Sequence, residues 1–283
     1  MTITSQCPSD RCAAIVAGVP QPELPPWRAA SWRYIVDLDG TLIRNGAALP
    51  GAAPLLEALA GRYAIVSNNS TDTAAGLSRK LHRMGLAVAP AHLVLAGEMT
   101  VDWLARTSPD ARVLLLGSPT LRRHAQRMGC RLVAQGADVV LLARDPCFSY
   151  GKLSAAVNAL RAGARLVVTN PDISHPGDNG TCVPETGTLL AALTACAEVQ
   201  PECVIGKPSA ALFREGLRRL QARPAQALMI GDNPATDAVG AIAMGMSFLL
   251  LGTGPGAEAK TPAQLLDTWC TGRKALPSEL NSV

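Results

Sequence analysis

The sequence has few aromatic residues, 4% of its 283 positions, and no apolar run long enough to cross a bilayer. Its hydrophobic content of 48% and charged content of 17% are ordinary for a globular protein. No run approaches the ~20 apolar residues of a membrane-spanning helix. The formal net charge of +4 is spread along the chain, without a basic stripe and interleaved aromatics. We therefore expect neither membrane nor nucleic acid as a partner.

Cysteine pairs with the spacing of a zinc site are also lacking. The eight cysteines are scattered, and the one close pair, Cys7 and Cys12, lies in an unpatterned N-terminal stretch. Residues 12–19 are faintly apolar, but the charges before them and Pro20 after them make a poor signal peptide. Scattered thiols are typical of a reducing compartment, so the sequence predicts a cytoplasmic protein without disulfides.

What the chain does contain, from about residue 32, is an alternation of short apolar runs and helical patterns. Strand-like runs cover 34–38, 63–67, 112–116, 139–143, 165–169, 227–230 and 246–251. Amphipathic stretches cover 52–60, 71–84, 150–161, 209–220 and 235–243. This alternation predicts an α/β fold with parallel sheets and crossover helices. Residues 1–31, rich in proline and alanine, are expected to form an arm or a disordered leader.

Two carboxylates, Asp37 and Asp39, stand one residue apart at the end of the first apolar run. Side chains alternate along a strand, so both would leave its carboxyl end on the same side. Gly40 then allows the backbone to turn. Two close acids repel unless a cation or a shared proton separates them. The pair predicts a metal site, an acid and nucleophile pair, or both, although Asp-x-Asp-Gly also occurs in turns and calcium loops.

Three further polar clusters, 67–71, 206–209 and 231–237, each follow a short apolar run. In open parallel sheets, ligands bind just beyond the carboxyl ends of the strands, so four such clusters can converge on one crevice. Their chemistry suits phosphoryl transfer. Asp37, Asp39 and Asp232 offer oxygen ligands for Mg²⁺. Ser67 and the amides near Asn68 can bind phosphate oxygens, and Lys207 supplies a compact positive charge.

These residues resemble the haloacid dehalogenase (HAD) superfamily. Asp37-x-Asp39-Gly40-Thr41 is similar to its first motif, Ser67 to its second, Lys207 to its third, and Gly231-Asp232 with Thr236-Asp237 to its fourth. Four further segments resemble subclass IIA, which includes nitrophenyl-phosphatases, nucleotidases and the pyridoxal-phosphate and phosphoglycolate phosphatases: 49–52, 67–71, 169–172 and 206–209.

The resemblance implies a role for each motif residue. Asp37 would be the nucleophile, and Asp39 the general acid and then base. Mg²⁺ would be held by the Asp37 carboxylate, the Asp39 main-chain carbonyl and the Asp232 carboxylate. Asp237, with Asn233 beside it, would lie behind these ligands and orient Lys207 or metal-bound water. An acid in a first helical turn is, however, also favourable to the helix dipole.

The resemblance also implies a Rossmann-like core with a smaller α/β cap inserted between the second and third motifs. We expect the core to comprise 32–108 and 202–270, the cap 109–201, and the tail 271–283. In the cap, Asp172 and His175 resemble a substrate-reading loop, although His175 could also be a plain loop histidine. Ser174 and Glu185 depart from relatives, which often have an aromatic and a glycine there. His82, His92 and His124 are expected to be solvated and without partners.

The sequence therefore predicts a Mg²⁺-dependent phosphatase that hydrolyses a small phosphorylated metabolite through an aspartyl-phosphate. By the resemblance it would form a homodimer joined through the cap. The alternative is a catalytically weak or inactive HAD-fold protein that serves as a metabolite-binding or scaffold module. Other HAD chemistries fit less well, because dehalogenases lack the second acid and ion-pumping ATPases carry Asp-Lys-Thr-Gly.

Overall fold

The structure, a computed structural model, describes residues 31–177, 180–253 and 256–271. The chain divides into two compact units. The first holds residues up to Ile65, Met84–Ala87 and residues from Leu217 onward, and the second holds Val66–Arg83 and Val88–Gly216. The predicted N-terminal arm and C-terminal tail lie outside the described residues, apart from Ser31 and Thr271.

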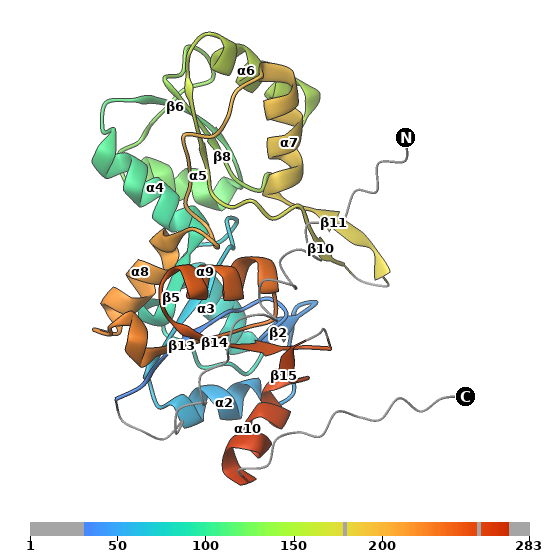
Figure 1. The fold of residues 1–283 in the computed structure, drawn as a ribbon. Helices are drawn as coiled ribbons and strands as arrows, with labels where there is room; N and C mark the ends of the chain where they lie inside the picture. Colours follow the sequence, from blue (N-terminus) through green and yellow to red (C-terminus); the bar gives the residue numbers. More distant parts are fainter. Residues whose placement is uncertain (1–30, 178–179, 254–255, 272–283) are drawn as a thin grey trace, which may run out of the picture. The chain divides into compact units, whose positions relative to one another are not determined.

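The first unit is built on parallel strands in the order β15-β14-β13-β1-β4. Its strands are β1 (Arg33–Val36), β2 (Ile43–Arg44), β3 (Ala47–Ala48), β4 (Tyr63–Ser67, where the second unit begins), β13 (Ala227–Gly231), β14 (Ser247–Leu251) and β15 (Ala257–Ala259). Its helices are α2 (Ala52–Leu59), η3 (Pro224–Gln226), the π-helical turn η4 (Pro234–Ala238), α9 (Val239–Ala243) and α10 (Pro262–Thr271). Figure 1 shows α2 and α10 side by side.

The register of this sheet positions the acidic motifs. Val36, the last residue of β1, pairs with Ile230 of β13. The main-chain N–H of Asp37 donates to the carbonyl of Ile230 at 2.8 Å. Because the two strands are parallel and in this register, the residues that follow them leave neighbouring strands at the same edge of the sheet. The loops that carry Asp37 and Asp232 therefore start next to each other.

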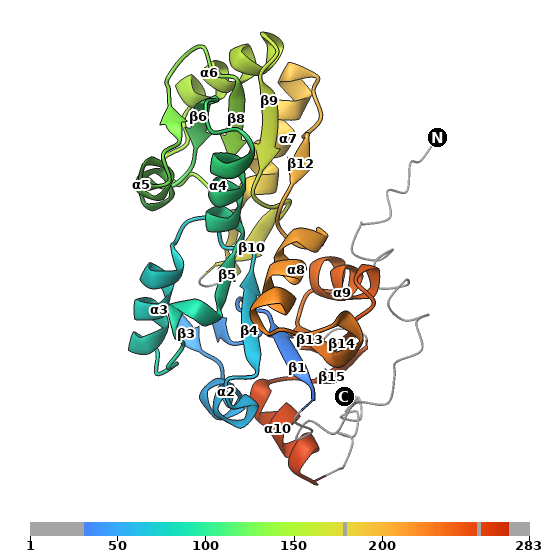
Figure 2. The ribbon, with the colours of Figure 1, turned by 90° about the vertical axis from the view of Figure 1, so that its left-hand side faces the viewer.

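The second unit contains a five-stranded parallel sheet in the order β12-β9-β8-β6-β7 (Figure 2). Its strands are β5 (Leu93–Leu95), β6 (Arg112–Leu116), β7 (Arg131–Leu132), β8 (Val139–Leu142), β9 (Arg165–Val168), β10 (Ser174–Pro176), β11 (Cys182–Pro184) and β12 (Cys203–Val204). Its helices are α3 (Ala74–Arg83), η1 (Pro90–His92), α4 (Ala96–Thr107), α5 (Pro119–Arg127), α6 (Tyr150–Arg161), α7 (Thr186–Ala197) and α8 (Ala210–Arg219), of which α8 runs on into the first unit.

Alternating residues of this sheet enter two separate cores. Leu114, Leu116, Val140 and Leu142 pack with residues of α6 and α7. Their neighbours Val113, Leu115, Val139 and Leu141 pack with residues of α4 and α5 on the opposite face. Figure 1 shows these helix pairs on the two sides of β6 and β8. Strands buried on both faces read as continuous apolar runs, which is why β6 and β8 were predictable.

Several predicted details differ from the structure. His124 was expected to be solvated, but Nε2 of its partly buried ring lies 2.8 Å from Oδ1 of Asp102 on α4. The ring Nδ1 of His82 lies 3.0 Å from the carbonyl of Ser78. The predicted helix 235–243 begins instead with the π-helical turn η4. The contact between His124 and Asp102 joins α5 to α4, and a sequence pattern does not contain such a tertiary contact.

Candidate active site

Three carboxylates of the first unit form an acidic cluster: Asp37, Asp232 and Asp237. Asp37 follows β1 and Asp232 follows β13, while Asp237 lies in η4. One carboxylate oxygen from each lies within 4.8 Å of the others. Asp37 is 6% exposed and Asp237 is 1% exposed. Buried like charges at this separation repel strongly unless a cation lies between them.

Neighbouring groups fix the acidic cluster in place. The hydroxyl of Thr41, which is fully buried, lies 3.3 Å from Oδ2 of Asp37 and 3.5 Å from Oδ1 of Asp232. The main-chain N–H of Asn233 donates to Oδ2 of Asp237 at 3.1 Å. Gly40 has φ +87°, and a Cβ there would collide with the Asp232 carboxylate. A glycine is therefore required at this position by both backbone conformation and space.

The donor set of the acidic cluster fits a hard divalent cation, since it consists of carboxylate oxygens alone. Asp237 belongs to this cluster, although the resemblance gave it no direct contact with the metal. Asp39 does not belong to it. Its side chain is exposed, and its main chain forms a bridge to Ile43. An exposed carboxylate two residues from Asp37 suits proton transfer, and the resemblance requires only its main-chain carbonyl as a ligand.

The predicted phosphate-binding residues lie in the second unit. Ser67 ends β4 and is buried, and its hydroxyl accepts from the N–H of Asn69 at 3.0 Å. The side chain of Asn68 forms hydrogen bonds with both main-chain polar groups of Lys207. Its Oδ1 accepts from the Lys207 N–H at 2.7 Å, and its Nδ2 donates to the Lys207 carbonyl at 3.2 Å. Lys207 is 3% exposed. Asn68 thus positions the lysine through its main chain.

Asn68 also ties this lysine to the predicted cap loop. Its Nδ2 lies 3.0 and 3.1 Å from the two carboxylate oxygens of Asp172. Asn170, which is 1% exposed, donates to the carbonyl of Asn68 at 2.9 Å and to the hydroxyl of Thr186 at 3.2 Å. The loop after β4 and the loop after β9 are therefore one hydrogen-bonded assembly.

His175 lies on β10 and contacts Glu185, a residue that the sequence analysis noted only because it differs from relatives. Its Nδ1 is 2.7 Å from Oε1 of Glu185, and Nε of Arg144 is 3.4 Å from the same oxygen. Burial raises the pKa of Glu185, and Arg144 and His175 only partly oppose that shift. The sequence analysis included Thr41, Ser70 and Asn170 in motif segments without giving them a role, and it did not single out Arg144, which becomes informative only through its spatial partners.

Two family profiles match the chain. A haloacid dehalogenase-like hydrolase family matches residues 34–131, and a second HAD-hydrolase-like family matches residues 204–268. The 5′-nucleotidase YutF of Bacillus subtilis is 32% identical over 224 residues, which cover 78% of this chain and 87% of that protein. The chain belongs to the HAD superfamily, subclass IIA.

Other relatives agree with this family assignment. A dihydroxyacetone phosphatase of Corynebacterium glutamicum is 29% identical over 80% of this chain and 83% of its own. The crystal structure of a 4-nitrophenylphosphatase from Thermotoga maritima superposes with a TM-score of 0.73 at 30% identity, and covers 83% of this chain and 89% of that one. The predicted family and α/β fold class are confirmed, and the chain is a hydrolase of a family that contains phosphatases and nucleotidases.

Proposed function

We propose that the protein is a Mg²⁺-dependent phosphatase that hydrolyses a small organic phosphate monoester through an aspartyl-phosphate on Asp37. The acidic cluster carries this proposal, because three carboxylates within 4.8 Å of one another need a cation to coexist in ionised form. Relatives named as a nucleotidase, a dihydroxyacetone phosphatase and a 4-nitrophenylphosphatase support it.

The proposed metal ligands are the carboxylates of Asp37 and Asp232 and the main-chain carbonyl of Asp39. Mg²⁺ in this place would neutralise charge on the phosphate oxygens and on the nucleophile. Asp237 and Asn233 would hold the turn that presents Asp232, as the 3.1 Å hydrogen bond between them indicates.

The chain's own residues would perform the two chemical steps. A carboxylate oxygen of Asp37 attacks phosphorus while the bond to the leaving-group oxygen breaks, and Asp39 gives its proton to that oxygen. Asp39 then takes a proton from water, the water oxygen attacks phosphorus, and the bond to Asp37 breaks. Inorganic phosphate leaves and both aspartates return to their starting state.

In this proposal, the phosphate oxygens are bound by Ser67, the amides near Asn68 and Lys207. The Asn68 side chain is already engaged with Lys207 and Asp172, so its contribution would come through the main chain. A cap of residues 109–201 would read the leaving group through Asp172 and His175.

Phosphate release from p-nitrophenyl phosphate, glycerol 3-phosphate and a nucleoside monophosphate tests the proposal. We expect turnover with Mg²⁺, none with EDTA, and full recovery when Mg²⁺ is added back. Binding of Mg²⁺ and phosphate esters without turnover on any substrate would favour the binding or scaffold alternative instead.

A further inference from the structure

The proposed phosphate-binding loop, residues 67–71, is held by residues that follow two strands of the five-stranded sheet. The main-chain N–H of Arg144, after β8, donates to the hydroxyl of Ser70 at 3.1 Å. The side chain of Asn170, after β9, donates to the carbonyl of Asn68 at 2.9 Å. Because β8 and β9 are neighbouring parallel strands, their carboxyl ends lie at one edge of the sheet. The loop is therefore bonded to that edge within one unit.

The chemistry of its neighbours determines which way the Asn68 amide faces. An ionised carboxylate only accepts hydrogen bonds, and a main-chain N–H only donates. Nδ2 must therefore face Asp172, whose carboxylate oxygens lie 3.0 and 3.1 Å away, and Oδ1 must face the N–H of Lys207, 2.7 Å away. With the amide reversed, both contacts would be lost. Asp172 thus favours the orientation in which Asn68 holds Lys207.

Asp172 is itself held at both of its main-chain polar groups. Its N–H donates to Oδ1 of Asn170 at 3.2 Å, and its carbonyl accepts from the N–H of Gly187, in the first turn of α7, at 2.7 Å. A Cβ at Gly187 would collide with the carbonyl oxygens of Pro171 and Asp172, so a glycine is required for this close approach. The carboxylate is therefore presented to Asn68 from a fixed main chain.

The main chain just before Lys207 packs against the same amide. The N–H of Gly206 donates to the carbonyl of Thr169 at 2.7 Å, and a Cβ on Gly206 would lie 2.7 Å from Oδ1 of Asn68. With so little space, a rotation of the Asn68 amide would displace the main chain that carries the lysine. A displacement of about 1 Å in an active site can cost about a hundredfold in rate.

We infer that Asp172 is a positioning residue for the phosphate group: through Asn68 it holds Lys207 where the ammonium group meets the phosphate oxygens. This role is additional to the reading of the leaving group proposed above. It acts alike on every phosphate ester and on inorganic phosphate, because the lysine contacts the part that they share. The inference rests on the proposed function, in which Lys207 binds phosphate.

Equilibrium binding to the full-length Asp37→Asn protein, in Mg²⁺, tests this role without turnover. Calorimetry gives the dissociation constants of inorganic phosphate and glycerol 3-phosphate. We expect added Asp172→Ala to weaken both ligands by the same factor of about 10 to 100, the worth of a hydrogen bond to a charged group. Asp172→Asn keeps one acceptor oxygen for Asn68 and should weaken both less. If the alanine variant does not fold, the asparagine variant decides by the same equality of factors.

A double-mutant cycle tests whether Asp172 acts through Asn68. Asn68→Ala keeps the main-chain amide but removes the side chain, and should weaken inorganic phosphate at least as much as Asp172→Ala does. Combining the two substitutions should weaken it no further than Asn68→Ala alone, because both side chains belong to one chain of hydrogen bonds. Additive losses would overturn the inference.

Asp138→Ala is the matched control, since it removes an exposed acid paired with Arg112 in the same unit and should leave both constants within about twofold. Weaker glycerol 3-phosphate with unchanged inorganic phosphate would show that Asp172 reads only the leaving group, and would overturn the inference. So would unchanged binding of both ligands, or an Asp37→Asn protein that binds no phosphate. Turnover of p-nitrophenyl phosphate by the unmodified protein reports separately on the proposed function.

Discussion

Substitutions at two glycines with similar backbone conformations distinguish backbone strain from disturbance of the acidic cluster. Gly40 and Gly46 have φ values of +87° and +72°, but only a Cβ at Gly40 would collide with Asp232, because nothing lies within 4 Å of one at Gly46. Alanine at either position meets left-handed strain of about 1–2 kcal/mol. We expect Gly40→Ala to raise the Mg²⁺ concentration for half-maximal activity at least about tenfold. Gly46→Ala should leave it unchanged, and an equal shift in both variants would contradict this account.

The raised pKa of Glu185 predicts an unusual pH dependence of stability. Between the ordinary value of 4.5 and the raised value, the folded state holds the proton more tightly than the unfolded state, so stability falls as pH rises through this window. Glu185→Gln removes that loss. Its melting temperature relative to the unmodified protein should therefore increase from pH 4 to pH 7.5.

Glu202→Gln, measured in parallel, gives the effect of removing an exposed acid from the same unit. A relative melting temperature of Glu185→Gln that decreases toward pH 7.5 would show that Arg144 and His175 outweigh burial.

At the scale of elements, Asn170 joins the loop after β9 to the loop after β4 and to the start of α7. Asn170→Ala leaves the partly buried carbonyl of Asn68 without this donor, which should lower the free energy of unfolding by about 1–3 kcal/mol. Asn158→Ala, on the exposed face of α6, is the control and should stay within about 0.5 kcal/mol. Urea denaturation followed by circular dichroism measures both, and equal effects would contradict the role of Asn170.

The sequence predicted the elements whose residues repeat a strong pattern. The bounds of β4, β6 and α6 agree with the predicted 63–67, 112–116 and 150–161, because β4 and β6 are largely apolar and α6 carries its buried residues at helical spacing. The hairpin of β10 and β11 was missed. Its strands have three residues each and expose both their ends, so no apolar alternation marks them.

In the site, too, the sequence marked some residues and missed others. Asp37, Asp232 and Asp237, all predicted as site residues, do lie together, because β1 and β13 are neighbouring parallel strands whose carboxyl ends lie at one edge of the sheet. Arg144 and Glu185 are 41 positions apart in the sequence. Arg144 belongs to none of the motif segments, and Glu185 stood out only as a departure from relatives. Only the fold brings their side chains together.

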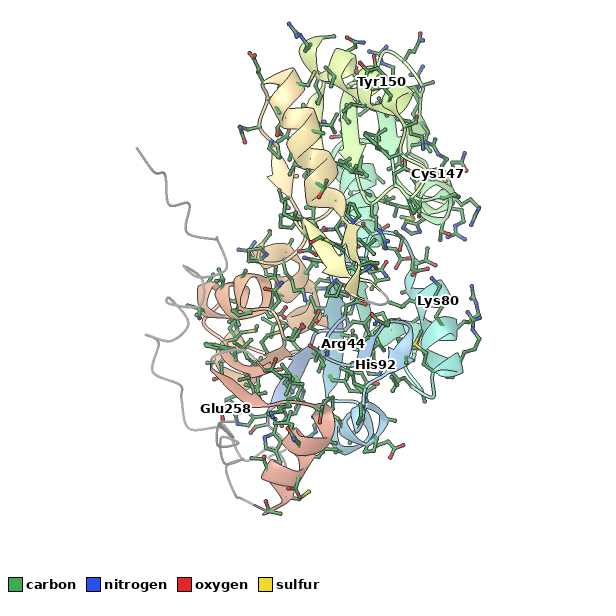
Figure 3. The ribbon with its side chains drawn as sticks, turned by 90° about the vertical axis from the view of Figure 1, so that its right-hand side faces the viewer. Arg44, Lys80, His92, Cys147, Tyr150 and Glu258 are labelled. Carbon is green, nitrogen blue, oxygen red and sulfur yellow. The ribbon has the colours of Figure 1, made fainter. Side chains whose placement is uncertain are left out.

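For the whole molecule, the family and the fold class are confirmed. Phosphatase activity through an aspartyl-phosphate on Asp37 stays a proposal. Among the described residues, no helix has both the length and the apolar character to cross a bilayer. The exposed large apolar side chains among them are Met128, Tyr150 and Ile173, all in the second unit, and Figure 3 shows Tyr150 at its surface. A cytoplasmic location and a homodimer joined through the cap stay predictions from the sequence.

In the proposed mechanism Asp37 forms the bond to phosphorus, so the rate of p-nitrophenyl phosphate hydrolysis in Mg²⁺ depends on this side chain. We predict that Asp37→Asn, which keeps the shape of the side chain but removes the nucleophile, lowers kcat at least about a thousandfold. Asp110→Asn changes an exposed acid of the second unit and should keep the full rate. An Asp37→Asn protein that folds normally and retains the rate of the unmodified protein would contradict the account.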